Sequence, residues 1–474
     1  MQGYLNKQIL LPVVLLCAAG KMSGQTQQRL NVLFIMADDL RPELGCYGVR
    51  EIKTPNIDRL AQSALLFRNA YCNVPVSGAS RASLLTGVLP HYPERFVQFD
   101  AWASKDYPSA IPVSKWFTDH GYYTISNGKV FHNIKDHADS WSECPWRVNP
   151  EGYGADWAEY NKWELWMNDE SGNYINPKSM RGPFCESAAV PDTAYDDGKG
   201  TVRTIEDLRR LKKSEKPFFL ACGFWRPHLP FNAPQKYWDM YEREQIPLAT
   251  NPYYPSDLPK KVEPSKEIFS YARVTDTNEE AFQREAKHGY YACVSYIDAQ
   301  IGLILDELEK LGLDKNTIVV FLGDHGWALG EHTFWGKHTL FDKATHVPLI
   351  VRVPGMETGS TQSMVSFVDL YPTLCELCGL PKPEGQLQGK SLVPILKDPE
   401  ASVQSEVYIQ WEGGDNLVNN RYNYAEWVKP EKTIRMLFDH QEDKDENHNI
   451  ASQSRYQSLM NGFSAIIRKI KAHL

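Results

Sequence analysis

Short, uninterrupted apolar runs recur along the chain and predict buried strands. Runs of this length, rich in Val, Ile, Leu and Phe, are typical of strands covered on both faces of a parallel sheet. The strands are expected at residues 29–37, 217–222, 317–322 and 347–351. Apolar residues spaced three and four apart predict helices at residues 55–71 and 279–311. This alternation predicts an α/β fold, with helices on both faces of a large, mixed and mostly parallel sheet.

The pattern changes after residue 402. Residues 406–411 and 421–427 alternate between polar and aromatic or apolar side chains, as antiparallel strands do, and residues 453–474 predict a closing helix. We therefore expect a large α/β unit at residues 25–400 and a smaller α+β unit, built on an antiparallel sheet, at residues 401–474.

Residues 140–200 are rich in Trp and Tyr but show no clear periodic pattern. We interpret them as an insertion near the strand ends. Their aromatic side chains either pack locally as a lid or stack on sugar rings, and local packing is favoured because most aromatic side chains bury area. The aromatic residues are Trp141, Trp146, Tyr153, Trp157, Tyr160, Trp163 and Trp166.

Residues 1–24 have the pattern of a secretory signal peptide. Lys7 precedes an apolar run at residues 9–20, and small residues follow it. The run is too short to span a bilayer, which takes about 20 apolar residues. A buried N-terminal strand or helix is the alternative, but nothing amphipathic continues from the run. We expect export of the chain, removal of this segment, and no membrane span elsewhere.

The charge balance narrows the class of partner. Of the 474 residues, 51 are Lys or Arg and 59 are Asp or Glu, which gives a formal net charge of −8. A general nucleic-acid binder needs a basic face to replace the counterions of phosphate groups, so the chain is not expected to bind nucleic acid. A local cluster of cations inside an acidic protein can still bind a small anion.

The nine cysteines are too few for a disulfide scaffold. Cys144 and Cys185 flank the aromatic insertion, and we consider a disulfide between them. Cys375 and Cys378 have the spacing of a zinc or redox motif within a predicted helix at residues 369–380. No second pair or histidine lies nearby, so we interpret them as buried core thiols.

Acidic residues follow two of the predicted strands. Asp38 and Asp39 end the first strand, and Asp324 and His325 follow another. Ligands of open α/β sheets bind outside the carboxyl ends of the strands. Carboxylates that converge there repel one another unless a cation lies between them, and such oxygen ligands favour Ca²⁺ or Mg²⁺. For Asp38 and Asp39 alone a helix cap or turn is an equal explanation, but the second acidic strand end favours a metal site.

The most specific motif is Ser-Gly-Ala-Ser-Arg-Ala-Ser-Leu-Leu-Thr-Gly at residues 77–87. It resembles the signature of the type I sulfatases, with matches at Ser77, Ala79, Arg81, Thr86 and Gly87. The chain is similar to this family over about residues 29–450 and resembles most the iduronate-2-sulfatase group. The segments that carry this resemblance are residues 127–132, 225–231, 335–338 and 345–350.

The resemblance implies an alkaline-phosphatase-like fold and a formylglycine made by oxidation of Ser77. Its hydrate supplies a geminal diol. One hydroxyl attacks sulfur and the alcohol leaves; the second hydroxyl then loses its proton, the carbonyl re-forms and sulfate is expelled. Ser77 stands where many members have Cys. In the family, such serines are modified by an anaerobic radical-SAM maturing enzyme in bacteria, so the resemblance implies a bacterial host and a periplasmic or cell-surface location.

The resemblance also assigns roles to the site residues. Asp38, Asp39, Asp324 and His325 would bind one Ca²⁺ that also contacts modified Ser77. Arg81, Lys129 and Lys337 would stabilise the diol and the sulfate charge, a task suited to fixed cations in a water-poor pocket. His132 and His228 would move protons near neutral pH. The acid for the leaving oxygen is either His228 or Lys337, and the sequence leaves this choice open.

The substrate implied by the resemblance is a 2-O-sulfated uronic acid at the non-reducing end of heparan- or chondroitin-type di- or oligosaccharides, hydrolysed by a monomeric enzyme. Choline sulfate or another small ester is an alternative. So is a phosphoester hydrolase of the same superfamily, although such enzymes use two zinc ions. A secreted glycan-binding protein without catalysis is a third alternative, but it would be expected to lose some of the cationic residues that are present here. A serine hydrolase would need G-x-S-x-G around Ser77, which is absent.

Overall fold

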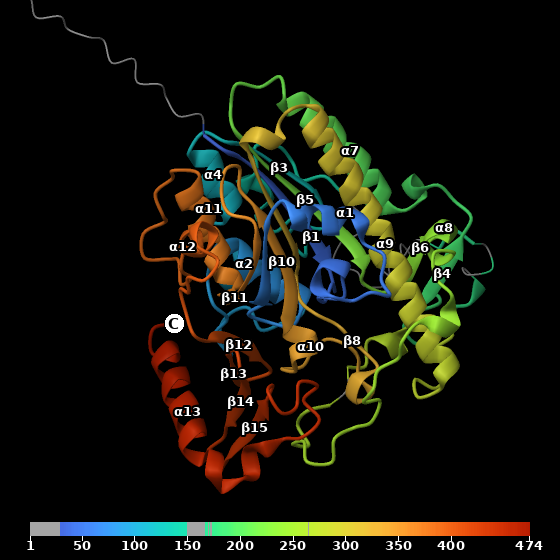
Figure 1. Ribbon diagram of the computed structural model, residues 1–474, viewed down its shortest axis with the longest axis vertical. Coiled ribbons are helices and arrows are strands. Elements are labelled where there is room, and N and C mark those ends of the chain that lie inside the picture. Colours follow the sequence, from blue (N-terminus) through green and yellow to red (C-terminus); the bar gives the residue numbers. More distant parts are fainter. Residues whose placement is uncertain (1–28, 149–165, 169, 171–172, 264) are drawn as a thin grey trace, which may run out of the picture.

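A seven-stranded sheet forms the centre of the larger part of the molecule (Figure 1). The computed structural model describes residues 29–148, 166–168, 170, 173–263 and 265–474. The expected signal peptide and four of the seven aromatic residues of the predicted insertion, Tyr153, Trp157, Tyr160 and Trp163, lie outside these ranges. The strand order is β11-β2-β10-β7-β1-β5-β3, and β10 runs against the other six. The strands are β1 (Asn31–Asp38), β2 (Leu65–Tyr71), β3 (Tyr123–Gly128), β5 (Phe218–Pro227), β7 (Thr317–Gly323), β10 (His346–Arg352) and β11 (Gly359–Ser366).

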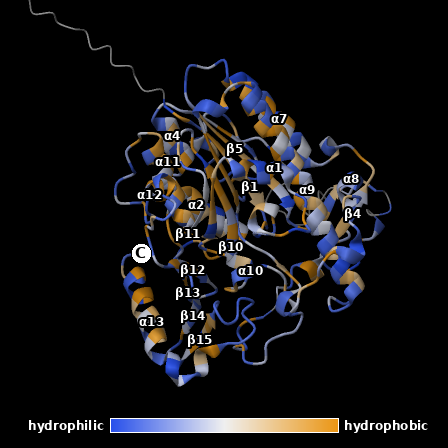
Figure 2. Cartoon of the chain, in the orientation of Figure 1, coloured by the Kyte–Doolittle hydropathy of each residue, from blue (hydrophilic) through white to orange (hydrophobic). Residues whose placement is uncertain are grey.

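Helices cover both faces of this sheet, as the sequence predicts. Along β1, Leu33 and Ile35 pack on one face and Phe34 and Met36 on the other, because successive side chains of a strand point in opposite directions. The first face carries α1 (Pro55–Gln62), α7 (Asp196–Leu211) and α9 (Glu280–Lys310), and the second carries α2 (Ser77–Thr86), α4 (Val113–Asp119), α11 (Leu370–Leu377) and α12 (Val393–Lys397). The central strands are correspondingly apolar, whereas the outer faces of the helices are polar (Figure 2).

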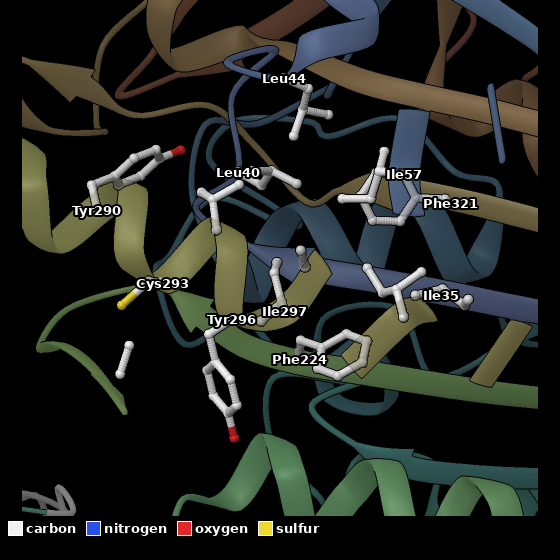
Figure 3. Packing of buried hydrophobic residues seen from close by; sticks show 14 of the residues in the cluster. Ile35, Leu40, Leu44, Ile57, Phe224, Tyr290, Cys293, Tyr296, Ile297 and Phe321 are labelled. Carbon is white, nitrogen blue, oxygen red and sulfur yellow. The ribbon is translucent and has the colours of Figure 1, made fainter. Parts of the chain in front are cut away.

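The long helix α9 supplies much of the packing on the first face. Tyr296 and Ile297 lie over the sheet beside Ile35 and Phe224, as Figure 3 shows. Complete burial of each such side chain contributes about 1.5–3 kcal/mol. Further along α9, Tyr290 reaches the loop that follows β1, so the helix that covers the sheet also contacts the chain where the first strand ends.

One expected helix is wrong in its second half. The helix predicted at residues 55–71 ends at Gln62, and residues 65–71 form β2 instead. This strand lies between β11 and β10, with Leu66 facing one side of the sheet and Phe67 the other. The free energy gained by burying both faces of this strand in the sheet exceeds the preference for a helix that the apolar spacing indicates. The strands predicted at residues 217–222, 317–322 and 347–351 and the helix at 279–311 are confirmed within a few residues.

The C-terminal part holds a four-stranded antiparallel sheet in the order β12-β13-β14-β15. One face packs under α13 (Gln457–Lys471), and the other shares a buried cluster with Tyr71, Phe334 and Phe341 of the larger part. The strands and the closing helix predicted here are therefore confirmed. The strands are β12 (Val407–Trp411), β13 (Gly414–Val418), β14 (Tyr422–Val428) and β15 (Thr433–Asp439). The shorter elements are α3 (Ala103–Asp106), α8 (Gln235–Trp238), α10 (Asp342–Thr345), β4 (Cys185–Ala188), β6 (Phe231–Pro234), β8 (Ala328–Leu329) and β9 (Trp335–Gly336).

The structure contradicts one prediction about the cysteines and confirms another. The considered pairing of Cys144 with Cys185 is wrong, because both are free thiols: Cys144 is exposed, whereas Cys185 is buried with its Sγ 3.7 Å from Glu285 Oε1. Cys375 and Cys378 are buried in the core, as predicted. Within the described ranges, none of the helices is both long and apolar enough to cross a membrane.

We expect Gly223→Ala to destabilise the protein and to lower its activity. A Cβ atom on Gly223 of β5 would lie 1.9 Å from the carbonyl oxygen of Lys129, so the backbone after β3 must move. Overpacking of this kind costs about 1–3 kcal/mol. Gly200→Ala in α7 is the matched control, because its Cβ meets nothing within 4 Å and alanine favours the helix. Thermal unfolding measures both variants, and equal melting temperatures for the two would contradict the expectation.

Candidate active site

Every predicted site residue lies near one edge of the central sheet, where the six co-directional strands end. Asp38 and Asp39 end β1, Lys129 follows β3, and His228 follows β5. Asp324 and His325 follow β7, and Ser77 begins α2, six residues after the end of β2. Parallel strands bring their carboxyl ends to the same edge, so residues that are up to 300 positions apart in sequence meet here by topology.

Four of these residues form a compact cluster. Ligand atoms of Asp38, Asp39, Asp324 and His325 all lie within 4.8 Å of one another, and all four residues are fully buried. The backbone holds the cluster in place: the amide of Asp39 donates to Asp324 Oδ1 at 3.0 Å, and the Asp39 carbonyl accepts from Tyr290 of α9 at 2.9 Å. Asp39 adopts a left-handed backbone with φ of 61°, an uncommon conformation for a residue other than glycine.

The chemistry of this cluster fits a hard divalent cation. Burial, together with repulsion from Asp38, raises the pKa of Asp39 to about 7 and that of Asp324 to about 6, so the carboxylates are costly to keep ionised without a cation. His325 Nδ1 lies 3.0 Å from the carbonyl oxygen of Gly326, which can only accept a proton. That contact places the hydrogen on Nδ1 and leaves the Nε2 lone pair facing the acids, as in a metal-ligating histidine. These four residues would hold the Ca²⁺ that the sequence predicts.

Ser77 touches this cluster from the start of α2. Its Oγ donates to Asp38 Oδ1 at 2.8 Å and lies 2.9 Å from His325 Nε2. The side chain is buried, and the amide end of the helix favours negative charge at this position. A group attached to the Ser77 side chain therefore lies within reach of the same cation that the carboxylates would bind.

Three basic side chains surround the cluster. Arg81 Nε donates to Asp324 Oδ2 at 2.8 Å, Lys129 pairs with Asp38, and Lys337 Nζ lies 2.9 Å from Asp39 Oδ1. Burial lowers the pKa of Lys129, whereas Asp39 and Glu267 outweigh the effect of burial on Lys337 and raise its pKa. The paired carboxylates thus hold each cation beside the position of Ser77.

The two predicted histidines border the same cavity. His228 Nδ1 lies 2.6 Å from the carbonyl oxygen of Leu229. His132 has no hydrogen-bond partner for its buried Nδ1 among the described residues. Burial lowers the pKa of both imidazoles. A histidine kept near its neutral form at the wall of a cavity can exchange a proton with a bound molecule.

Sequence reasoning missed Glu267. Its two carboxylate oxygens lie 3.2 Å from His228 Nε2 and 3.3 Å from Lys337 Nζ, so one acid joins the two candidate proton donors. Although burial opposes ionisation, Lys337 and His228 keep the pKa of Glu267 well below its usual range. Glu267 lies in a loop between elements and belongs to none of the motifs, so no signal in the sequence identifies it.

These side chains open into a cavity of about 450 Å³, a volume typical of small-ligand sites. Segments that carry no predicted site residue complete its wall, and they contribute polar groups such as Ser179, Arg181 and Ser270. The residues that line the cavity are Val76, Ser77, Phe99, His132, Ser179, Arg181, His228, Glu267, Ser270, Lys337 and His338.

A carboxylate and imidazole cluster beside a helix-initiating serine, surrounded by fixed cations, is typical of a hydrolase that acts on anionic esters. The chain belongs to the sulfatase family, whose model matches residues 30–380, and is a sulfuric ester hydrolase. A second family model, "N-sulphoglucosamine sulphohydrolase, C-terminal", matches residues 330–473. Over 426 residues the chain is 35% identical to iduronate 2-sulfatase of Homo sapiens, which covers 79% of this chain and 74% of that protein.

Solved structures share the fold. The phosphonate monoester hydrolase of Silicibacter pomeroyi superimposes with a TM-score of 0.73 at 22% identity, over 94% of this chain and 95% of that one. A protein solved in complex with its substrate D-glucosamine-2-N,6-O-disulfate superimposes with a TM-score of 0.71 at 20% identity, over 94% and 98% of the two chains. These likenesses confirm the predicted alkaline-phosphatase-like architecture.

We expect Ca²⁺ to stabilise the protein through the four-residue cluster. After treatment with a chelator, added Ca²⁺ should raise the melting temperature more than Mg²⁺ does, because Mg²⁺ demands stricter geometry. At 100 times its dissociation constant, the ion would contribute about 2.7 kcal/mol. Asp39→Asn should lose most of the response, whereas Asp257→Asn, at an exposed position outside the cluster, should keep it. An equal response in both variants would exclude the cluster as the binding site.

We expect Glu267→Gln to lower kcat by roughly ten- to a hundredfold, since Lys337 and His228 lose a shared charged partner. The Ca²⁺ response should remain, because Glu267 is outside the metal cluster. Steady-state kinetics together with thermal unfolding test this, and Glu384→Gln at an exposed position is the control. A wild-type kcat in the Glu267 variant would show that this bridge is dispensable.

Proposed function

We propose that this sulfatase hydrolyses glycosaminoglycan-derived sugars, and that it removes the 2-O-sulfate of a uronic acid at the non-reducing end of a heparan- or chondroitin-type fragment. The observation that carries this proposal is the 35% identity to an iduronate 2-sulfatase over 79% of the chain. All ten residues predicted for the site face one another or one cavity, which supports an intact catalytic set over a binding protein that has lost catalysis.

Formylglycine made from Ser77 would supply a geminal diol as the nucleophile, and Ca²⁺ bound by the cluster would balance the charge of the sulfate oxygens. Side chains of this protein would stabilise the charge of the sulfate and transfer the protons. Arg81, Lys129 and Lys337 keep positive charge beside the sulfate. His228 and Lys337 border the cavity where the sugar oxygen departs, and one of them gives that oxygen its proton. His132, which lines the same cavity as Ser77, would exchange the proton of the diol.

We propose further that the chain is exported with loss of residues 1–24, acts in the periplasm or at the cell surface, and works as a monomer. Maturation of Ser77 would then require the anaerobic radical-SAM enzyme before export. Units at residues 25–400 and 401–474 would together form the mature protein. The acidic composition agrees with short fragments as substrates, because a long sulfated polymer would meet a surface of like charge.

Two other substrate classes follow from specific observations. The match to an N-sulphoglucosamine sulphohydrolase model over residues 330–473 favours a sulfated glucosamine as the second candidate. The likeness to a phosphonate monoester hydrolase, at 22% identity, supports the fold and leaves a phosphoester as an outcome to be tested.

The first test is mass spectrometry of the peptide that holds Ser77, from protein made in an anaerobic host with the maturing enzyme. Loss of two hydrogens at Ser77 is expected. The matured protein should release sulfate from 2-O-sulfated uronic acid disaccharides, and should show at least about tenfold lower kcat/KM on 6-O- or N-sulfated glucosamine and on phosphonate monoesters. Unmodified serine in active enzyme would overturn the mechanism, and the reverse substrate order would overturn the assignment of the sugar.

A further inference from the structure

A second cavity, of about 680 Å³, adjoins the active-site cavity. We call this second cavity the outer groove. The two cavities share Phe99 and His338, so a molecule that extends from Ser77 past these two side chains would enter the outer groove. Its volume alone is typical of a complete small-ligand site. The residues that line the outer groove are Gln98, Phe99, Lys261, Val262, Glu263, Ser265, Lys266, His338, Thr339, Leu340, Trp411, Glu412 and Trp427.

An aromatic platform stands where the groove meets the active site. The ring of Trp411 stacks on His338, with 5.3 Å between ring centroids and 16° between ring planes. Trp411 ends β12, and a two-residue turn at Glu412 and Gly413, with φ of 47° and 70°, pairs it with Gly414 of β13. Positive φ at both turn positions is typical of a tight hairpin that fits the twist of its strands. The C-terminal sheet therefore holds Trp411 rigidly at the entrance to the site.

Polar side chains surround this aromatic surface. Gln98 and Ser265 line the outer groove together with four charged side chains. A wall that combines aromatic rings with polar groups suits a molecule that is rich in hydroxyl groups.

The charges of the groove are balanced. Lys261 lies 3.7 Å from Glu412, and Lys266 lies 3.4 Å from Glu263. This differs from the active-site cavity, where basic groups gather around the sulfate position. A groove with paired charges and an aromatic surface suits an uncharged or zwitterionic sugar ring better than a second strongly anionic one, because each lysine already has an acidic partner.

We propose that the outer groove is a second sugar subsite, which binds the residue glycosidically linked to the sulfated sugar and packs it against Trp411. This inference rests on the proposed function and specifies its substrate: a disaccharide that carries a hexosamine-type ring beside the sulfated uronic acid. The C-terminal sheet, rather than the aromatic insertion at residues 140–200, then supplies the aromatic surface for this sugar.

The test compares matured wild type and Trp411→Ala on a 2-O-sulfated uronic acid alone and on the disaccharide that contains it. Loss of the platform should raise KM for the disaccharide about five- to tenfold and leave its kcat within about twofold, so that the preference for disaccharide over monosaccharide falls. Trp411→Phe should retain most of this preference, because it keeps a stacking ring. Tyr253→Ala removes an aromatic ring that is 51% exposed and lines neither cavity, and serves as the control.

Melting temperatures show whether Trp411→Ala is folded. If it is not, Trp411→Leu, which removes the flat ring but keeps an apolar side chain at the end of β12, is used with the same pair of substrates and should also raise the disaccharide KM. An unchanged preference in folded variants would overturn the subsite while the proposed function stands. Failure of the wild type, with Ser77 verified as modified, to hydrolyse either uronic acid substrate would instead overturn the proposed function.

Discussion

The repulsion among buried carboxylates is the constraint on which the site depends. Asp38, Asp39, Asp324 and Glu267 lie within one small region. In the described part of the chain, the Lys and Arg side chains that pair with them are Arg81, Lys129 and Lys337. His228 and His325 also contact these acids, but burial lowers their pKa and keeps them near neutral. With all four acids ionised the region carries a net negative charge, which would repel a sulfate ester. A divalent cation in the cluster would reverse that sign. The same ion therefore would both stabilise the fold and permit an anionic substrate to enter.

The sheet topology makes this crowding possible. Each strand that contributes a site residue runs in the same direction, and β10, the one reversed strand of the sheet, contributes none. The glycine at 223 lets the backbone of Lys129 pass close over β5, and Tyr290 of α9 fixes the carbonyl of Asp39. Packing far from the cavity thus sets the positions of Lys129 and Asp39, so the stability of the core and the geometry of the site are coupled.

The sequence predicts those features that depend on residues close together in the chain, and not those that depend on distant segments meeting in the fold. Each acidic strand end, and the motif that begins at Ser77, is a short continuous stretch of sequence. Neighbouring apolar runs predict the strands that precede the acidic residues. β2 was missed because its apolar residues have helical spacing, and its place between β11 and β10 is a property of the whole sheet. Glu267 could not be found either, since a single acid in a loop becomes meaningful only through its distances to His228 and Lys337.

The two cavities differ in charge, and this difference relates the net charge of the protein to the substrate that we propose. An enzyme with a net charge of −8 can still bind an anion when its positive groups are confined to one buried position, as they are around Ser77. The outer groove does not continue this positive field, because its lysines are paired with Glu412 and Glu263. In the complex that we propose, electrostatic attraction would therefore end at the first sugar, and recognition of the next one would come from shape, stacking and hydrogen bonds. Such a division of the site would select for the end of a chain, since only one sulfated residue would meet strong positive charge.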